Sequence, residues 1–548
     1  MSVNNNLGPG ASGGGNEKNF IFAMVLLFTV LVGFSVFQMM QPQPKAAEQQ
    51  AVKETAKTET ASNAAAAPAD VKKIAAVKLP AGKEVTLENE DVLAVFDTKG
   101  AALKSWKLKK ILLGDKQVEL VWKDNAEGSP FALNSEKAGF KDGLIYAAEK
   151  KDSSLTFSGR DEAGNEVAKV FTMQKKGFNL DCEISFKTKT KGVLNDVKLA
   201  AAAGIGCHDP STKIPPLNIS RVNGKTEKSR PGKFDIEAPL AKEINTLSWT
   251  GVKDKYFAVL FVVPETEGFK GTVKKTRAEI SDSNGVKTPV EMPVVSLVLP
   301  DFKGEEGKTF KFKVYAGPLI YENLIAYGSN LHDALDYGMF GWLGIIFLKT
   351  LKFFHGIVGN WGIAIIMLSL LIKGILWWPN QNSYKSMKKL QEVQPHVNAL
   401  REQYKSDPQR MNTEMLKIYK ERKINPLSGC FWMLIQLPVL FALYAILGNA
   451  IEMKDSPFMF WVTDLSGPDK YWVMPILMGA TMWVQQKMTP STDPQQAKMM
   501  LWMMPIMFTG MSIYFRWPSG LVLFWFVQNL LSLLQQYLVN KAPAAAAA

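Results

Sequence analysis

This chain of 548 residues contains several long apolar runs, each with at most one charged residue. Runs of about 20 apolar residues with at most one charge are typical of helices that cross a membrane. One run precedes residue 50 and five follow residue 360: Phe20–Met40, Trp361–Trp378, Gly429–Leu447, Trp472–Gln486, Met499–Phe515 and Leu521–Val539. The pattern predicts an N-terminal anchor helix and a five-span core over residues 361–540, and it excludes an all-soluble enzyme.

Residues 85–318 show a different pattern, in which short apolar runs with alternating polar positions are separated by Gly, Pro, Asn and Asp. This spacing, without a strong amphipathic helix, is typical of an antiparallel β-sandwich. The clearest candidate strands are Val92–Phe96, Val118–Trp122, Val167–Met173, Leu180–Phe186, Tyr256–Val263, Val294–Leu299 and Phe310–Ala316. The predicted fold is therefore a membrane α-helical bundle with a large antiparallel β-sandwich domain.

Less strongly patterned segments connect these parts. Residues 1–19 predict a disordered tail, residues 41–84 a flexible linker and residues 541–548 a second tail. The run Phe20–Met40 is too long and too poor in cleavage signals for a signal peptide, so an uncleaved anchor is favoured. Residues 319–360 form a linking segment. Its helix around Met339–Leu348 is predicted to lie in the membrane interface, with an ordinary packing helix as the alternative.

The loops between the spans indicate an orientation. Residues 380–427 carry ten Lys and Arg residues, whereas residues 448–470 carry two. The positive-inside rule places the basic loop in the cytoplasm. On this topology the spans lie in the inner membrane of a bacterium, the N-terminus is cytoplasmic and the β-domain is periplasmic.

Composition narrows the function further. The net charge is +13, but the lysines of a periplasmic β-domain meet no nucleic acid, so DNA is not an expected partner. The chain has only three cysteines, which excludes a disulfide scaffold. We expect Cys182 and Cys207 to be free, buried thiols, and a disulfide between them is the open alternative. The four histidines lack metal-ligand spacing, and the sequence predicts no metal or other cofactor.

The candidate chemistry lies inside the spans. None of the five core spans contains Asp or Glu, which weakens the case for an ion-coupled transporter. Trp361–Trp378 contains one cation, Lys373, with Ser369 one turn before it, and Gln436 is among the polar residues of the other spans. Two interpretations of Lys373 stay open. It either snorkels to the cytosolic interface or lines a polar cavity that opens to the cytosol.

The basic loop, residues 380–427, has the periodicity of a helical hairpin. Apolar residues recur at three- and four-residue steps, and Ser406-Asp407-Pro408 predicts the start of the second helix. The basic residues form either a solvated surface or a surface that docks on anionic lipid headgroups or ribosomal RNA. The docking candidates are Lys385, Lys388, Lys389, Arg401, Lys405, Lys417, Lys420, Arg422 and Lys423.

Several motifs in register resemble the YidC/Oxa/Alb membrane insertase family. They are Val358-Gly359-Asn360-Trp361-Gly362, Asn425-Pro426-Leu427-Ser428-Gly429-Cys430, Ile435-Gln436-Leu437-Pro438, Pro475-Ile476-Leu477-Met478-Gly479 and Trp517-Pro518-Ser519-Gly520-Leu521-Val522-Leu523. The resemblance covers residues 320–540, and the additional anchor and periplasmic domain are similar to the long Gram-negative form. It implies a supersandwich-like β-domain and an insertase and chaperone that is not an enzyme and has no catalytic residues.

The resemblance also implies site residues and partners. The groove cation of the family corresponds to Lys373, where bacterial members usually carry arginine, and its polar groove positions correspond to Ser369 and Gln436. The client-contacting aromatic positions of the last span correspond to Phe524 and Trp525, where tyrosines are common. The implied partners are nascent membrane proteins, the Sec translocon, the ribosome and signal recognition pathway, and anionic lipids.

The sequence thus favours a membrane protein insertase in which the hydrophilic flank of a client rests in a polar groove. The shortest predicted spans would reach only about 23–26 Å, so local thinning of the bilayer would shorten the remaining path. Two alternatives stay open. One is a transporter or lipid scramblase that uses the same cavity, and the other is a periplasmic polymer-binding protein anchored by the spans.

Overall fold

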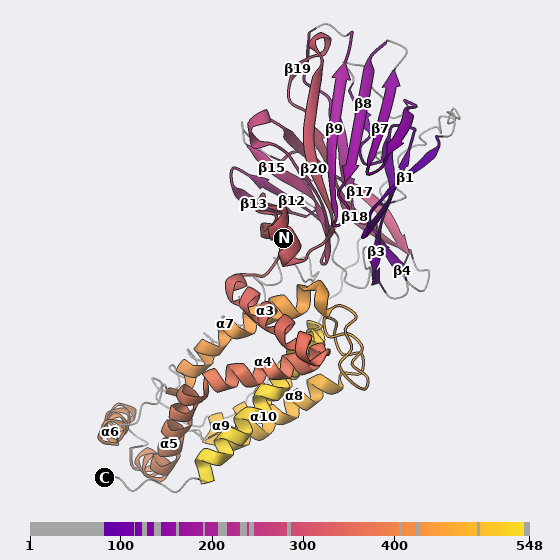
Figure 1. The fold of residues 1–548 in the computed structure, drawn as a ribbon. Helices are drawn as coiled ribbons and strands as arrows, with labels where there is room; N and C mark the ends of the chain where they lie inside the picture. Colours follow the sequence, from indigo (N-terminus) through magenta and orange to yellow (C-terminus); the bar gives the residue numbers. More distant parts are fainter. Residues whose placement is uncertain are drawn as a thin grey trace, which may run out of the picture.

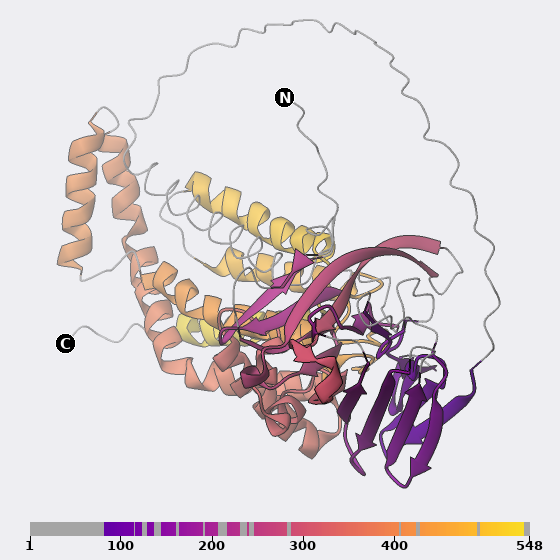
Figure 2. The same cartoon turned by 90° about the horizontal axis from the view of Figure 1, so that it is seen from above.

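The computed structural model describes residues 82–113, 116–122, 129–135, 144–160, 164–189, 192–206, 216–230, 238–240, 246–281, 287–404, 407–422, 428–489 and 494–541. The predicted N-terminal tail and anchor, most of the linker and the C-terminal tail lie outside the described residues, apart from Lys541. Figure 1 shows the strands gathered in one body and the helices in a second. The predicted helical hairpin projects from the end of the bundle furthest from the strands, and Figure 2 shows this projection from above.

Antiparallel pairing organises the β-domain, as the alternating pattern predicts. The described strands are β1 (Glu84–Glu88), β2 (Val92–Asp97), β3 (Ala102–Leu113), β4 (Lys116–Glu119), β5 (Leu133–Asn134), β6 (Ala147–Lys151), β7 (Ser154–Arg160), β8 (Glu166–Met173), β9 (Asn179–Lys187), β10 (Val193–Leu194), β11 (Lys198–Ala203), β12 (Leu217–Val222), β13 (Lys225–Ser229), β14 (Ala238–Pro239), β15 (Leu247–Lys253), β16 (Phe257–Val262), β17 (Lys270–Ser281), β18 (Lys287–Val298), β19 (Phe302–Lys303) and β20 (Lys308–Pro318). The largest sheet has the order β13-β12-β15-β16-β20-β9-β8-β7-β6. The smaller sheets have the orders β14-β17-β18-β11-β5, β1-β2-β3-β4 and β10-β19. Each of the seven predicted strands overlaps one of these elements.

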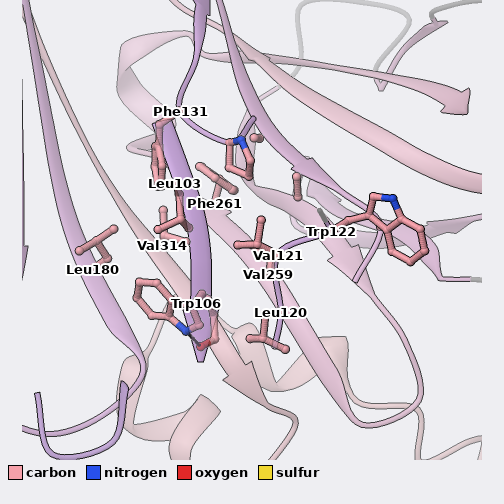
Figure 3. Close-up of a pocket in the computed structure, with 15 residues that line it drawn as sticks. Leu103, Trp106, Leu120, Val121, Trp122, Phe131, Leu180, Val259, Phe261 and Val314 are labelled. Carbon is pink, nitrogen blue, oxygen red and sulfur yellow. Dashed lines mark hydrogen bonds between the residues drawn. The ribbon is translucent and has the colours of Figure 1, made fainter. Parts of the chain in front are cut away.

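The core of the β-domain lies between the nine-stranded sheet and the smaller sheets. The Phe96 and Phe131 rings lie 4.7 and 4.9 Å from the ring of Phe171, between ring centroids. Trp106 is 1% exposed, and its indole N–H donates to the Ala316 carbonyl at 2.8 Å. A cavity of only about 20 Å³ remains beside Trp106 and Phe131 (Figure 3). That volume holds about one water molecule, so it is too small for a ligand.

The C-terminal half folds into helices at the predicted positions. Their bounds are α2 (Tyr321–Tyr327), α3 (Gly341–Val358), α4 (Trp361–Ile375), α5 (Trp377–Gln403), α6 (Pro408–Glu421), α7 (Ser428–Asn449), α8 (Val473–Met488), α9 (Pro494–Tyr514) and α10 (Ser519–Lys541). By length and composition over the described residues, α3 and α10 are long and apolar enough to cross a membrane. The bent pair of α4 and the first part of α5 adds a third crossing if it counts as one span.

One of the two short predicted spans belongs to a longer helix. α8 has 16 residues and is indeed short, but α9 has 21 residues and begins at Pro494, before the apolar run. A helix continues through polar residues beyond its apolar stretch, because the backbone hydrogen bonds do not depend on side-chain polarity. The helix is therefore longer than the apolar run Met499–Phe515, and the short membrane span stays a prediction.

The predicted span Trp361–Trp378 is not one straight helix. α4 ends at Ile375, α5 begins at Trp377, and the two segments are bent by 64°. Pro379 lies in the first turn of α5 and has no N–H to donate to the carbonyl of Ile375, which accounts for the break. Lys373 therefore lies one turn before a bend, which an apolar run in the sequence does not reveal.

The predicted hairpin consists of α5 and α6. Its two helices pack through Val393, Val397, Met415 and Tyr419, which lie on the predicted apolar stripes. The predicted start of α6 is confirmed, because Pro408 lies in its first turn and the Asp407 carboxylate accepts a hydrogen bond from the backbone N–H of Arg410 at 3.0 Å. The hairpin thus has a small core of its own outside the main bundle.

Asp336 joins the β-domain to the helices. Its carboxylate pairs with Lys253 at 2.8 Å and with Lys228, both on the nine-stranded sheet. Its backbone carbonyl accepts a hydrogen bond from the Asn449 side chain of α7 at 3.2 Å. Lys253 is only 3% exposed, so the ion pair is largely removed from water. Asp336 of the linking segment therefore contacts both bodies.

The linking segment also contains α3, which is longer than the apolar stretch Met339–Leu348. Lys352 Nζ lies 2.6 Å from a carboxylate oxygen of Glu322 and 2.6 Å from one of Glu452. Only the contact with Glu322 has hydrogen-bond geometry. Trp342 and Phe353 are each 65% exposed on this helix. Exposed apolar residues and an ion-paired lysine on one helix agree with an amphipathic segment, and its position in the interface stays a prediction.

The β-domain contains one of the cysteines in its described core. Cys182 is 3% exposed, and burial raises the pKa of its thiol well above the usual value. Cys207 lies outside the described residues. The expectation of two buried, unpaired thiols therefore stays a prediction.

Candidate functional site

Lys373 lies in the last turn of α4 and is 5% exposed. Its Nζ donates a hydrogen bond to Ser532 Oγ of α10 at 2.8 Å and lies 6.0 Å from the centroid of the Tyr384 ring on α5. Within the described residues, Lys373 forms no ion pair with a carboxylate. The ammonium group therefore turns inward to a neighbouring helix, whereas a snorkelling lysine would extend its charge to the membrane surface.

A polar stripe on α10 faces the α4–α5 bend. Gln528, Ser532 and Gln535 are four and three residues apart, which places them on one helix face. Gln528 donates to the Ser369 carbonyl at 3.0 Å, and Gln535 donates to the Trp377 carbonyl at 3.0 Å. We use the name polar cluster for Ser369, Lys373, Tyr384, Gln528, Ser532 and Gln535.

Gln535 of the polar cluster and Asn380 of α5 each have an unused hydrogen-bond acceptor. Asn380 is 4% exposed and Gln535 is 0% exposed, and the side-chain oxygen of each has no partner within the described residues. A buried polar atom without a partner costs roughly 1–3 kcal/mol. Both oxygens are buried, so a donor that enters the helical bundle and reaches either of them would be stabilised.

The other residues expected to line the groove lie in different surroundings. Ser369 is 0% exposed and its hydroxyl donates to the Ile365 carbonyl at 2.8 Å. Gln436 is half-buried on α7 and forms no hydrogen bond with the polar cluster among the described residues. Phe524 is 2% exposed in the helical core, and Trp525 stacks on Trp517 with 5.7 Å between ring centroids. Only Lys373 and Ser369 of this set therefore share the polar cluster.

Sequence reasoning missed Ser532, Gln535 and Tyr384. A usable signal was present in the last span, where polar residues recur at helical spacing within an otherwise apolar run. Tyr384 gave no such signal, because it reaches Lys373 only through the bend between α4 and α5. The partners of a buried cation come from separate helices, so spacing within one helix finds only part of the site.

The basic residues of the hairpin lie on its surface. The exposed ones are Lys385 and Lys389 on α5, Lys417 and Lys420 on α6, and Arg422 just beyond α6. Lys388 is half-buried and donates to the Asn540 carbonyl at 3.5 Å. The Arg401 side chain and all of Lys405 and Lys423 lie outside the described residues. The exposed charges fit either of the two interpretations, a solvated surface or a docking surface.

The glycine- and asparagine-containing motifs close the end of the bundle that faces the β-domain. Asn360 caps α4 by accepting from the Ile363 N–H at 3.1 Å, and its amide donates to the Phe458 carbonyl at 3.1 Å. A Cβ atom on Gly362 would lie 2.0 Å from the Phe458 ring, so this close approach needs glycine. The Ser519 hydroxyl donates to the Gly467 carbonyl at 2.9 Å. The turn before α10 and the loop after α7 are thus fastened together.

These features define a class of protein. A helical bundle carries a β-domain at one end and a basic hairpin at the other (Figure 1). Within α4, Lys373 is a buried cation that has no carboxylate partner among the described residues. If the bundle crosses a membrane, the β-domain and the basic hairpin lie on opposite sides of it. The chain is therefore a membrane protein with a polar site inside its helices.

Comparison with known proteins identifies the family. The family described as YidC periplasmic domain matches residues 84–349, and the family described as 60Kd inner membrane protein matches residues 353–546. The membrane protein insertase YidC of Syntrophus aciditrophicus is 35% identical over 96% of this chain and 99% of its own. That of Geobacter metallireducens is 35% identical over 97% of this chain and 100% of its own. The chain belongs to the YidC membrane protein insertase family.

A solved structure also aligns with the chain. It is the crystal structure of an active YidC insertase with the first transmembrane domain resolved, and it covers 85% of this chain and 94% of its own. The sequence identity is 17% and the TM-score is 0.36.

Proposed function

We propose that this protein inserts nascent membrane proteins by holding the hydrophilic flank of a client beside Lys373 while the apolar segment moves along the helices into lipid. The observation that carries the proposal is the burial of Lys373 against Ser532 without a carboxylate partner among the described residues. The family membership supports insertion as the activity, since its curated relatives carry that name.

The physical basis of the proposal is the cost of a charge that is not neutralised. A cation removed from water is stabilised when an opposite charge or polar donors and acceptors approach it. The unpaired acceptor oxygen of Gln535, within the polar cluster, extends this preference to N–H groups of a polypeptide. The polar cluster would therefore lower the free energy of a short polar flank part-way across the membrane, and no nucleotide, metal or catalytic residue takes part.

The proposed partners follow from the two ends of the molecule. The exposed lysines of the hairpin would meet the ribosome, the signal recognition pathway or anionic lipids in the cytoplasm. The helices would act alone or beside the Sec translocon. We place the N-terminus and the hairpin in the cytoplasm, the helices in the inner membrane and the β-domain in the periplasm, as the distribution of Lys and Arg favours.

Site-specific crosslinking tests the proposed client path. A photoreactive amino acid at Gln436, half-buried on α7, should crosslink to the first apolar segment of a stalled nascent membrane protein. The same probe at Ile346, which is 51% exposed on α3, serves as the control. Equal crosslinking from both positions, or none from Gln436, would contradict a client path through this part of the bundle.

The transporter or scramblase alternative makes a different prediction for the same helices. Reconstituted vesicles without nascent chains would then show solute or lipid flux that Lys373→Leu abolishes. The polymer-binding alternative predicts that deletion of most of residues 85–318 abolishes function while the helices stay intact. An insertase that works through the polar cluster predicts neither result.

A further inference from the structure

The loop between α7 and α8 exposes large aromatic side chains. Phe460 is 84% exposed, Tyr471 is 67% exposed and Trp472 is 57% exposed. The loop lies at the end of the bundle that faces the β-domain, where the Ser519 hydroxyl of α10 holds the Gly467 carbonyl. Exposed apolar residues that are scattered singly over a protein surface are common, but these three belong to one short loop.

Two of the exposed aromatic residues have an unusual backbone conformation. Phe460 has a φ of 53° and Trp472 has a φ of 58°, in the left-handed region that bulky side chains rarely adopt. Such conformations cost free energy and persist only where the surrounding structure fixes them. Phe460 lies at the tip of a tight loop, which the Phe458 N–H closes by donating to the Val462 carbonyl at 3.0 Å. The fold therefore keeps the Phe460 ring outside the core in spite of this cost.

One buried carboxylate connects the two exposed segments. Asp469 is 6% exposed and accepts a hydrogen bond from the Trp461 indole N–H at 3.2 Å. It also accepts from the backbone N–H groups of Tyr471 at 3.0 Å and Met474 at 2.7 Å. Trp461 in turn stacks on Phe460 with 5.9 Å between ring centroids. We use the name aromatic surface for Phe460, Trp461, Tyr471 and Trp472.

The base of the loop is attached to both bodies of the molecule. The Ser466 hydroxyl lies 3.0 Å from the Tyr256 hydroxyl of the β-domain. The Leu465 carbonyl accepts a hydrogen bond from the Gly520 N–H of α10 at 2.9 Å, and the Leu465 side chain is fully buried. The aromatic surface thus extends from a base that is fixed to the β-domain and to the bundle.

The chemistry of the aromatic surface favours lipid. Trp and Tyr combine an apolar ring with a polar N–H or O–H, which suits the boundary between lipid and water. The exposed apolar surface continues along α8, where Ile476 is 57% exposed and Leu477 is 39% exposed. Residues 451–472 contain four carboxylates and two lysines, so they have no basic excess that would select anionic headgroups.

We infer that the aromatic surface inserts into the lipid leaflet on the β-domain side of the membrane, at the level of the headgroups. Removal of the exposed rings from water by lipid is favourable, and it explains why a strained backbone holds them outside the core. Because α8 begins at the residue after Trp472, this contact fixes the depth of that end of α8. The inference requires that the helices cross a membrane, and it does not depend on how Lys373 acts on a client.

Photocrosslinking to lipid tests the inference. A photoreactive phenylalanine derivative replaces Phe460 in the full chain, which is reconstituted into phosphatidylcholine vesicles and irradiated. Mass spectrometry of the peptide that contains position 460 should show covalent lipid adducts. Addition of phosphatidylglycerol should leave the yield unchanged, because the contact is made by apolar rings and not by basic side chains.

The matched control is a residue of similar character far from the helices. Val193 is 52% exposed on β10, which pairs with β19, and Figure 1 shows β19 at the end of the β-domain away from the bundle. The same probe at Val193 should give no lipid adducts. A Phe460 yield no higher than that of Val193, or adducts to a second copy of the chain in place of lipid, would overturn the inference. A yield that requires phosphatidylglycerol would also overturn it.

Discussion

Replacement of Lys373 tests whether its charge attracts the flank of a client. Because Lys373 is 5% exposed, an effective dielectric constant of about 20 is more appropriate than that of water. A carboxylate about 5 Å from Nζ then gains roughly 3 kcal/mol of attraction. Dehydration of that carboxylate offsets part of this attraction and leaves a net stabilisation of about 1–2 kcal/mol. Lys373→Leu should therefore slow insertion of a client with an acidic flank roughly 5- to 30-fold.

The assay uses a client that does not need the Sec route, with an acidic flank or a neutralised version of it. Lys373→Leu should affect the acidic version alone, because the neutral flank never had the attraction. Lys373→Arg should retain activity, since it keeps a long cationic side chain, and Lys373→Glu should be the slowest because it repels the flank. Lys487→Leu, which removes an exposed lysine on α8 outside the polar cluster, is the matched control.

One result would show that the charge of Lys373 does not recognise clients. If the acidic and neutralised clients insert equally well in the wild type and in the Leu and Glu variants, at equal protein levels, the charge of Lys373 has no role in client recognition. The buried position against Ser532 would then be a matter of packing alone.

Three further predictions concern other parts of the chain. Deletion of residues 387–420 with a flexible bridge should leave the protein in the membrane but impair insertion, and normal insertion by this variant would contradict a docking role for the hairpin. Asp336→Ala should destabilise the β-domain by about 2 kcal/mol in thermal unfolding, because Lys253 loses a buried partner. Asp336→Asn should destabilise it less, and an unchanged melting temperature of Asp336→Ala would refute this prediction. Burial alone would raise the pKa of Asp91. The hydrogen bonds from Lys110 and Gly177 have the larger effect, so the pKa of this carboxyl lies below its ordinary value of 3.8. The stabilisation by this carboxylate is complete above pH 3.8 and is lost as the pH falls through the lowered value, so Asp91→Asn should lower the denaturation midpoint at pH 7 more than at pH 3.

The sequence by itself determined the elements and their order. Alternation of apolar residues located the strands, because side chains in a strand point to opposite faces at every step. The hairpin was fixed by helical periodicity and by Asp407-Pro408, since caps act within a single turn. The absence of acids from the spans and the isolation of Lys373 were also visible in the sequence. All of these signals are local, and none requires knowledge of which elements become neighbours.

The tertiary structure decided which residues meet. Ser532 lies 159 residues after Lys373, and no periodicity links the two positions before α4 and α10 pack. The bend of 64° between α4 and α5 brings Tyr384 to the same lysine, although hydropathy shows one continuous run. Backbone periodicity acts over one turn or one strand, whereas burial and partner choice follow from how the whole chain packs, so only the folded structure determines them.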